Sequence, residues 1–197
     1  MDLLQQAWTH SMDYSGYRKL IEQLVQEGKT TGPVQDEHLI NYSKLNHSRM
    51  KRLDKTTRLT PELLSAVHTV SSPQNWLVLT ESWCGDAAQI IPILSAIAEQ
   101  SDNITLRLIL RDEHPEVMDN FLTYGGRSIP KLIIFEPESG KVLDTWGPRP
   151  QEAQEFRQSL MDQGVDKHEI SAQLQKWYNT DKGKLTQAEL TTLIHNI

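Results

Sequence analysis

The residue of this sequence best suited to nucleophilic or redox chemistry is Cys84, the single cysteine among 197 residues. One cysteine excludes an intramolecular disulfide, and it also excludes a zinc site built on paired cysteines. Redox chemistry in this chain must therefore pass through one sulfur and an external thiol. Because the thiolate is the reactive form of cysteine, the groups around the sulfur decide its reactivity.

This cysteine stands in the stretch Trp83-Cys84-Gly85-Asp86-Ala87, between a predicted strand and a predicted helix. A helix N-terminus offers unpaired N–H groups and a partial positive charge, and both favour the thiolate. The carboxylates of Asp86 and Glu81 act in the opposite direction, because a like charge near the sulfur raises its pKa. Gly85 lets another backbone approach closely, and Trp83 is placed to shield one side of the sulfur. A plainer role for Asp86 is to stabilise the first turn of the helix.

Hydrophobic periodicity places the cysteine inside a β-α-β-α-β-β-α order of elements. The helix between the first two strands implies a parallel crossover, and the short link between the last two strands predicts an antiparallel hairpin. The sheet should therefore be mixed, in an α/β fold with helices on its faces. Strands are predicted at residues 76–79, 104–110, 132–135 and 142–146, and helices at 85–100, 115–124 and 150–161.

Helical extensions are predicted on both sides of this core. Helices are expected at residues 14–25 and 39–53, and a third begins at Pro61 with Thr60 as its cap. Two short helices are expected near the C-terminus, at residues 167–178 and 186–195. We therefore expect an N-terminal helical extension (1–73) packed on the core, a core domain (74–163) and a C-terminal helical extension (164–197).

The stretch around the cysteine resembles the thioredoxin motif Trp-Cys-Gly-x-Cys, and three further features agree with that family. Pro92 matches the proline that kinks the active-site helix. Ser128-Ile129-Pro130 is similar to the family's cis-proline loop, and Gly147 follows the last strand near the substrate groove. The resemblance covers about residues 75–160 and implies a thioredoxin fold. It also implies a cis Ile129–Pro130 bond that faces Cys84, with the Ile129 backbone pairing to a bound substrate.

Two positions depart from the family pattern. Ala87 stands where the second cysteine resolves the mixed disulfide in the dithiol mechanism, so an external thiol would have to do so here. Val78 stands where classical thioredoxins carry a buried aspartate as proton acceptor, and valine takes no proton. Because a substrate-trapping variant would leave that position unchanged, Val78 favours natural divergence over an engineered replacement at Ala87.

Composition narrows the function classes. The formal net charge of −6 argues against general nucleic-acid binding, and no apolar run approaches the ~20 residues of a membrane span. Met1 to His10 shows no secretory signal pattern, so we expect a cytoplasmic protein. The histidines show no metal-binding spacing, and residues 179–190 lack the glycine and acidic positions of a calcium loop. We therefore expect neither a metal nor a cofactor.

Two groups of basic residues have plain structural interpretations. Arg149 lies in the stretch Trp146-Gly147-Pro148-Arg149-Pro150. Its side chain could contact the site or an acidic ligand. The plainer interpretation is that it belongs to a rigid turn that leads into a helix. A second group is interpreted as the solvated face of a helix rather than a nucleic-acid patch. It consists of Arg49, Lys51, Arg52, Lys55 and Arg58.

The resemblance implies a monothiol thiol–disulfide exchanger. In it Cys84 attacks, the Gly85 and Asp86 amides favour the thiolate, and Ile129-Pro130 positions a protein disulfide or thiol partner, with glutathione or a similar thiol as resolver. The alternative is a non-catalytic or redox-sensing binding module, in which the groove captures a protein partner. A third hypothesis, an iron–sulfur carrier, rests on analogy with monothiol glutaredoxins, whose usual Cys-Gly-Phe-Ser differs from this stretch. The residues alone leave open whether the chain is an enzyme.

Overall fold

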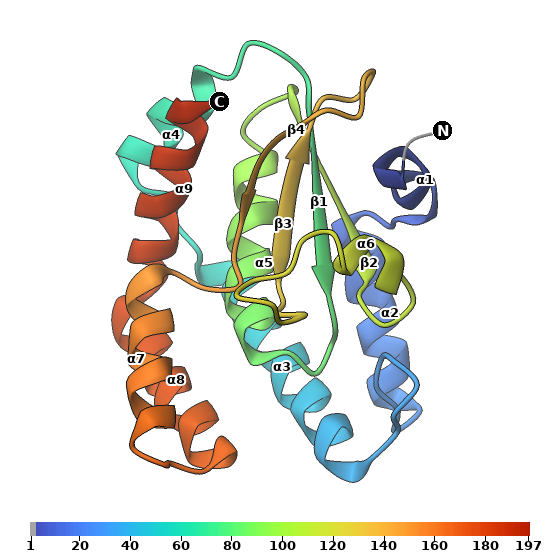
Figure 1. The fold of residues 1–197 in the computed structure, drawn as a ribbon, viewed down its shortest axis with the longest axis vertical. Helices are drawn as coiled ribbons and strands as arrows, with labels where there is room; N and C mark the ends of the chain where they lie inside the picture. The colour runs from blue at the N-terminus through green and yellow to red at the C-terminus, as the bar shows by residue number, and fades with distance from the viewer. Residues whose placement is uncertain (1–2) are drawn as a thin grey trace.

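The computed structural model describes residues 3–197. Within them, four strands form one mixed sheet in the order β2-β1-β3-β4 (Figure 1). β1 pairs in parallel with β2 and antiparallel with β3, and β3 and β4 form an antiparallel hairpin. The predicted parallel crossover, hairpin and mixed sheet are thus confirmed. The strands are β1 Gln74–Thr80, β2 Ile104–Leu110, β3 Lys131–Phe135 and β4 Val142–Trp146.

Helices flank this sheet, which confirms the α/β class, and further helices extend the core at both ends of the chain (Figure 1). Thr60 caps α4 as predicted, because its side chain accepts the Leu63 N–H at 3.3 Å. The helices are α1 Leu3–His10, α2 Tyr14–Gln26, α3 Glu37–Thr56, α4 Pro61–His68, α5 Gly85–Ala98, α6 Pro115–Met118, α7 Gln151–Asp162, α8 Lys167–Asp181 and α9 Lys184–Asn196.

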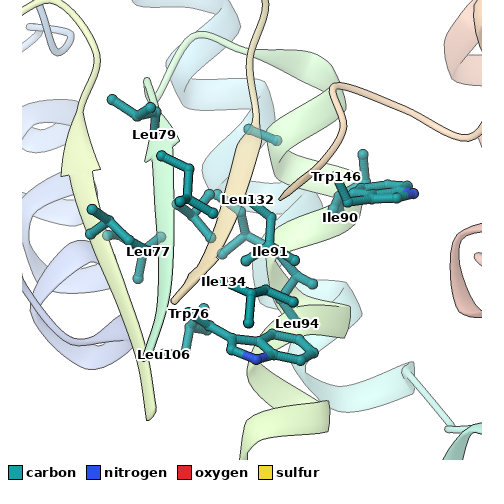
Figure 2. Close-up of a cluster of buried hydrophobic side chains, with 14 of the residues drawn as sticks. Trp76, Leu77, Leu79, Ile90, Ile91, Leu94, Leu106, Leu132, Ile134 and Trp146 are labelled. Carbon is teal, nitrogen blue, oxygen red and sulfur yellow. The ribbon is translucent and has the colours of Figure 1, made fainter. Parts of the chain in front are cut away.

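The centre of the core lies between α5 and one face of the sheet. Figure 2 shows side chains of α5, including Ile91 and Leu94, in one buried cluster with Trp76 of β1 and Ile134 of β3. Trp76 and Ile134 are register partners across the two strands. This packing fixes the start of α5 at the end of β1, where Cys84 lies.

The opposite face of the sheet is covered by N-terminal helices. Phe135, which follows Ile134 and so points the other way, makes a T-shaped contact with Trp8 of α1, with the ring centroids 5.5 Å apart. α2 packs on β2. Burial on both faces explains why the middle of β1, residues 76–79, is a continuous apolar run. The periodicity did not predict α1, a helix of eight residues that depends on such packing.

The terminal extensions pack on the core and on each other. α3 packs along α5, and α8 packs on α7. α4 and α9, from distant parts of the chain, lie side by side (Figure 1). The Gln187 side chain joins them, because it accepts the Thr60 amide at 2.8 Å and donates to the Arg58 carbonyl at 3.2 Å. The two extensions are therefore joined to each other as well as to the core.

The predicted helix at residues 115–124 is wrong beyond its first turn. α6 ends at Met118, and the chain continues in i→i−3 bonds such as that from the Phe121 N–H to the Met118 carbonyl. Tyr124 then takes a left-handed φ of +51°, followed by two glycines. A left-handed residue ends a right-handed helix, so this segment forms a turn that leads toward the loop before β3.

Candidate functional site

Cys84 occupies the N-cap of α5, directly after the turn that follows β1. The Ala87 N–H donates to its Sγ at 3.4 Å, so the sulfur takes the place of an ordinary capping oxygen. The Cys84 N–H itself closes the turn onto the Glu81 carbonyl at 3.1 Å. The Cys84 residue is only 8% exposed. The helix start thus holds the sulfur in one position and leaves little of it open to solvent.

The Cys84 thiol also donates to the carbonyl oxygen of Ile129 at 3.3 Å. The Ile129–Pro130 peptide bond is cis, so the residue pair expected from the sequence lies against the sulfur. Gly147 supports this loop from behind: its φ is +107°, and a Cβ there would come within 2.4 Å of the Pro130 carbonyl oxygen. Glycine is therefore the residue that this close approach requires.

A buried carboxylate network stands beside the sulfur. Asp86 accepts a bidentate pair from Arg149, at 2.6 and 3.2 Å, and a third hydrogen bond from the Tyr178 hydroxyl at 2.7 Å. The two charged side chains are only 9% and 12% exposed. Burial raises the pKa of Tyr178 well above its ordinary value, so this hydroxyl stays protonated and donates. Asp86 therefore does more than stabilise the first turn of α5.

Burial decides the protonation of the sulfur. Burial, together with the smaller effect of the negative charge of Asp86, raises the pKa of Cys84 to about 12. The N–H groups of Ala87 and Asp86 and the guanidinium of Arg149 act in the opposite direction without overcoming burial. The expected help from backbone amides thus comes from Ala87 and Asp86, whereas the Gly85 amide is not among the contributors.

The sulfur lines a cavity of about 320 Å³. Trp83, Gly85, Asp86 and Ile129 also line it, and the Arg111 guanidinium stacks over the Trp83 ring at 4.9 Å from its centroid. Ala87 is 1% exposed and lies within the core behind the sulfur. Pro130 and Gly147 are outside the lining of this cavity and form the layer that supports Ile129.

Several cavity residues come from outside the predicted motif. Arg49 of α3 is half-buried and lines the cavity, so its interpretation as part of a solvated helix face is wrong, whereas its basic neighbours on α3 are exposed. Arg149 contacts the site rather than serving only as a turn residue. Tyr178 of α8 and Arg157 of α7 had no sequence signal that separated them from ordinary helix residues.

The turn before the cysteine is tied to the N-terminal extension by buried hydroxyl groups. Ser82 accepts the Thr31 amide at 3.1 Å and contacts the hydroxyls of Thr30 and Ser43 at 3.1 and 2.8 Å. Asn46 donates to the Ser82 carbonyl at 2.9 Å. These bonds explain how residues more than thirty positions upstream hold the turn that carries Cys84.

Two further observations concern metal binding and membrane insertion. Among residues 3–197, no group of three or more His, Cys, Asp and Glu side chains is arranged to hold a metal ion. In that same part of the chain, no helix has the length and apolar character needed to cross a membrane.

Comparisons with known proteins agree with this architecture. A family model described as thioredoxin matches residues 32–162. Thioredoxin 1 of Synechococcus elongatus is 39% identical over 64 residues, which are 32% of this chain and 55% of that protein. The chain thus spans about half the length of the curated relative it matches.

Two solved structures are similar over almost their whole length. An HIV epitope-scaffold has a TM-score of 0.58 at 15% identity, with 94% of this chain and 99% of that chain covered. A protein of unknown function from Pseudomonas aeruginosa has a TM-score of 0.56 at 16% identity, with 93% and 98% covered. At these identities the two likenesses concern the fold alone.

Proposed function

Because this chain belongs to the thioredoxin family, we propose that it carries out thiol–disulfide exchange with Cys84 as its attacking sulfur. The observation that carries the proposal is the position of this sulfur. It caps α5, lines the cavity and lies against the Ile129 carbonyl. Since Ala87 stands where a second thiol would resolve the mixed disulfide, the exchanger is a monothiol one.

The reaction has two exchange steps. The Cys84 thiol loses its proton to solvent, and the thiolate attacks one sulfur of a substrate disulfide. A bond forms between the two sulfurs, the substrate S–S bond breaks, and the other substrate sulfur leaves as a thiolate. An external thiolate, from glutathione or a similar thiol, then attacks the substrate sulfur of the mixed disulfide. This step forms a disulfide between external thiol and substrate and returns Cys84 as a thiolate.

The Ile129 backbone is proposed to position a protein substrate. Its carbonyl accepts the Cys84 S–H in the resting protein. Once the sulfur has lost its proton, that carbonyl is free to accept an N–H from an extended substrate segment. We further propose a cytoplasmic setting, since a reducing compartment supplies the external thiol that the mechanism needs.

The test follows reduction of a protein disulfide in the presence of excess glutathione. The wild-type protein should accelerate the reaction, and the Cys84→Ser variant should not. An Ala87→Cys variant restores a second thiol within the first turn of α5, so it should complete one round of reduction without glutathione. Full activity of the Cys84→Ser variant would refute the proposal.

A second candidate function is a redox-sensing or non-catalytic binding module. The observation in its favour is the burial of Cys84, which is 8% exposed with a pKa of about 12 and so is a thiol at neutral pH. In that case the groove around Ile129 captures a protein partner without exchange. A partner complex that survives both Cys84→Ser and a reducing agent would favour this function over exchange.

A further inference from the structure

The cavity in front of Cys84 carries an excess of positive charge. Asp86 is the one carboxylate among its described lining residues, whereas five arginines line it. The chain as a whole has a formal net charge of −6, so the positive charge of this cavity is opposite in sign to the charge of the whole chain. Clefts lined by one sign of charge attract ligands of the opposite sign. The arginines are Arg49, Arg111, Arg127, Arg149 and Arg157.

Three of the five already have carboxylate partners. These pairs are Arg111 with Asp112 at 2.7 Å, Arg127 with Asp119 at 2.7 Å, and Arg149 with Asp86 at 2.6 Å. Within residues 3–197, neither Arg49 nor Arg157 forms an ion pair. Two guanidinium groups of the cavity are therefore left without a carboxylate in ion-pair contact.

Both unpaired arginines are half-buried. Arg49 donates one hydrogen bond to the Asn46 side chain at 2.9 Å, and its Nη1 lies 3.8 Å from where a Cβ on Gly85 would be, next to the reactive sulfur. Arg157 lies on α7, close enough to the Arg149–Asp86 pair to feel the like charge of Arg149 and, more weakly, the opposite charge of Asp86. Burial lowers the pKa of both guanidiniums. A partly desolvated cation without a partner is costly, and an anionic ligand would relieve that cost.

We propose that this cavity binds a small disulfide or thiol that carries carboxylate groups, with Arg49 and Arg157 as the anion-binding residues. The inference rests on the proposed function for its sulfur chemistry and names the substrate class of the same site. A volume of about 320 Å³ is at the lower end of small-molecule pockets, so the cavity has room for a small ligand of this kind. Such a ligand would react with Cys84 by the same two thiol–disulfide exchange steps, with no other oxidant or reductant.

The binding test uses a probe that cannot exchange. Suberate is the dicarboxylate in which two methylene groups replace the S–S of dithiodipropionate, so calorimetry with it measures anion recognition alone. Wild-type protein and Cys84→Ser should both bind it, and neither should bind the neutral diol of equal length. Arg49→Gln and Arg157→Gln should each raise the Kd by about tenfold or more. Added salt should weaken wild-type binding as well.

The matched control is Arg52→Gln, which removes the same charge from the same helix but lies outside the lining of this cavity. It should change the Kd by less than about twofold. Arg157 forms no hydrogen bond with the described residues that its removal would break, so Arg157→Gln and the salt series test the proposal even where Arg49→Gln fails to fold.

The outcomes separate this inference from the proposed function. Arginine-dependent suberate binding without a mixed disulfide on Cys84 would refute exchange and leave the anion site standing. Exchange through Cys84 with equal rates for dithiodipropionate and for bis(2-hydroxyethyl) disulfide, and no suberate binding, would overturn the anion site alone. If suberate does not bind but an acidic peptide disulfide reacts faster than a neutral one in an arginine-dependent way, the ligand is a protein segment and the small-molecule proposal is wrong.

Discussion

The thiol of Cys84 donates a hydrogen bond to the carbonyl oxygen of Ile129 across 3.3 Å and 45 positions of sequence. The bond joins the proposed attacking atom to the backbone that would hold a substrate. It exists only while the sulfur is protonated, since a thiolate has no proton to donate. Ionisation of Cys84 and release of the Ile129 carbonyl are therefore coupled events.

The first prediction concerns the pH dependence of Cys84 alkylation. Because burial raises the pKa of this thiol to about 12, the thiolate fraction should grow through the whole range from neutral to strongly alkaline pH. The rate of reaction with iodoacetamide should rise about tenfold per pH unit without a plateau near the ordinary ~8.5. The protein unfolded in urea is the control, and its alkylation rate should reach a plateau near pH ~8.5. A plateau below ~8.5 in the folded protein would show that the helix terminus outweighs burial.

The second prediction concerns Asp86→Asn. Removing the carboxylate removes a cause of the raised Cys84 pKa, so alkylation at a fixed pH near 8 should become faster. Arg149 loses its ionic partner in a buried site, so the free energy of unfolding should fall by up to about 3 kcal/mol.

Asp54→Asn is the matched control for this variant. Asp54 also accepts from an arginine and a tyrosine, Arg18 and Tyr14, but it is not among the groups that influence the Cys84 pKa. The Asp54→Asn variant should therefore leave the alkylation rate of Cys84 unchanged. An equal rate in the Asp86→Asn and wild-type proteins would mean that the carboxylate does not influence the sulfur.

The third prediction concerns Gly147→Ala. The added Cβ would meet the Pro130 carbonyl oxygen at 2.4 Å, and the φ of +107° is itself unfavourable for alanine. The Ile129–Pro130 loop should shift away from Cys84, with a lower melting temperature and slower exchange. Gly164→Ala is the control: its φ of +74° brings a backbone strain of ~1 kcal/mol, but no atom lies within 4 Å of the new Cβ. Equal melting temperatures for the two variants would contradict the packing argument.

The sequence predicts much of the sheet and the position of the sulfur. Periodicity places β2 and β4 at their observed bounds, because strands buried on one or both faces have distinctive apolar patterns. The Trp-Cys-Gly and Ile-Pro motifs indicate that Cys84 and Ile129 face each other, although neither motif says how buried the sulfur is. Burial depends on the packing of whole elements around it, which local patterns do not record.

Local sequence patterns do not predict the charged residues that surround the sulfur. Asp86 meets Arg149, in the turn between β4 and α7, across 63 positions, and it meets Tyr178 of α8 across 92 positions. Both contacts exist only because the chain after β4 returns to the start of α5. Arg49 shows the same limit, since a basic run on a helix is typical of a solvated face. Only the packing of α3 along α5 brings this one arginine to the cavity.

The most direct test of monothiol exchange is intact-protein mass spectrometry after exposure to bis(2-hydroxyethyl) disulfide at mildly alkaline pH. We expect one adduct on Cys84 that persists when excess disulfide is removed, because Ala87 supplies no thiol to displace it. The adduct should disappear on addition of glutathione. In the Ala87→Cys variant the adduct should be lost without glutathione. The absence of any adduct on Cys84, under conditions that fully modify a cysteine-containing peptide, would contradict exchange through this sulfur.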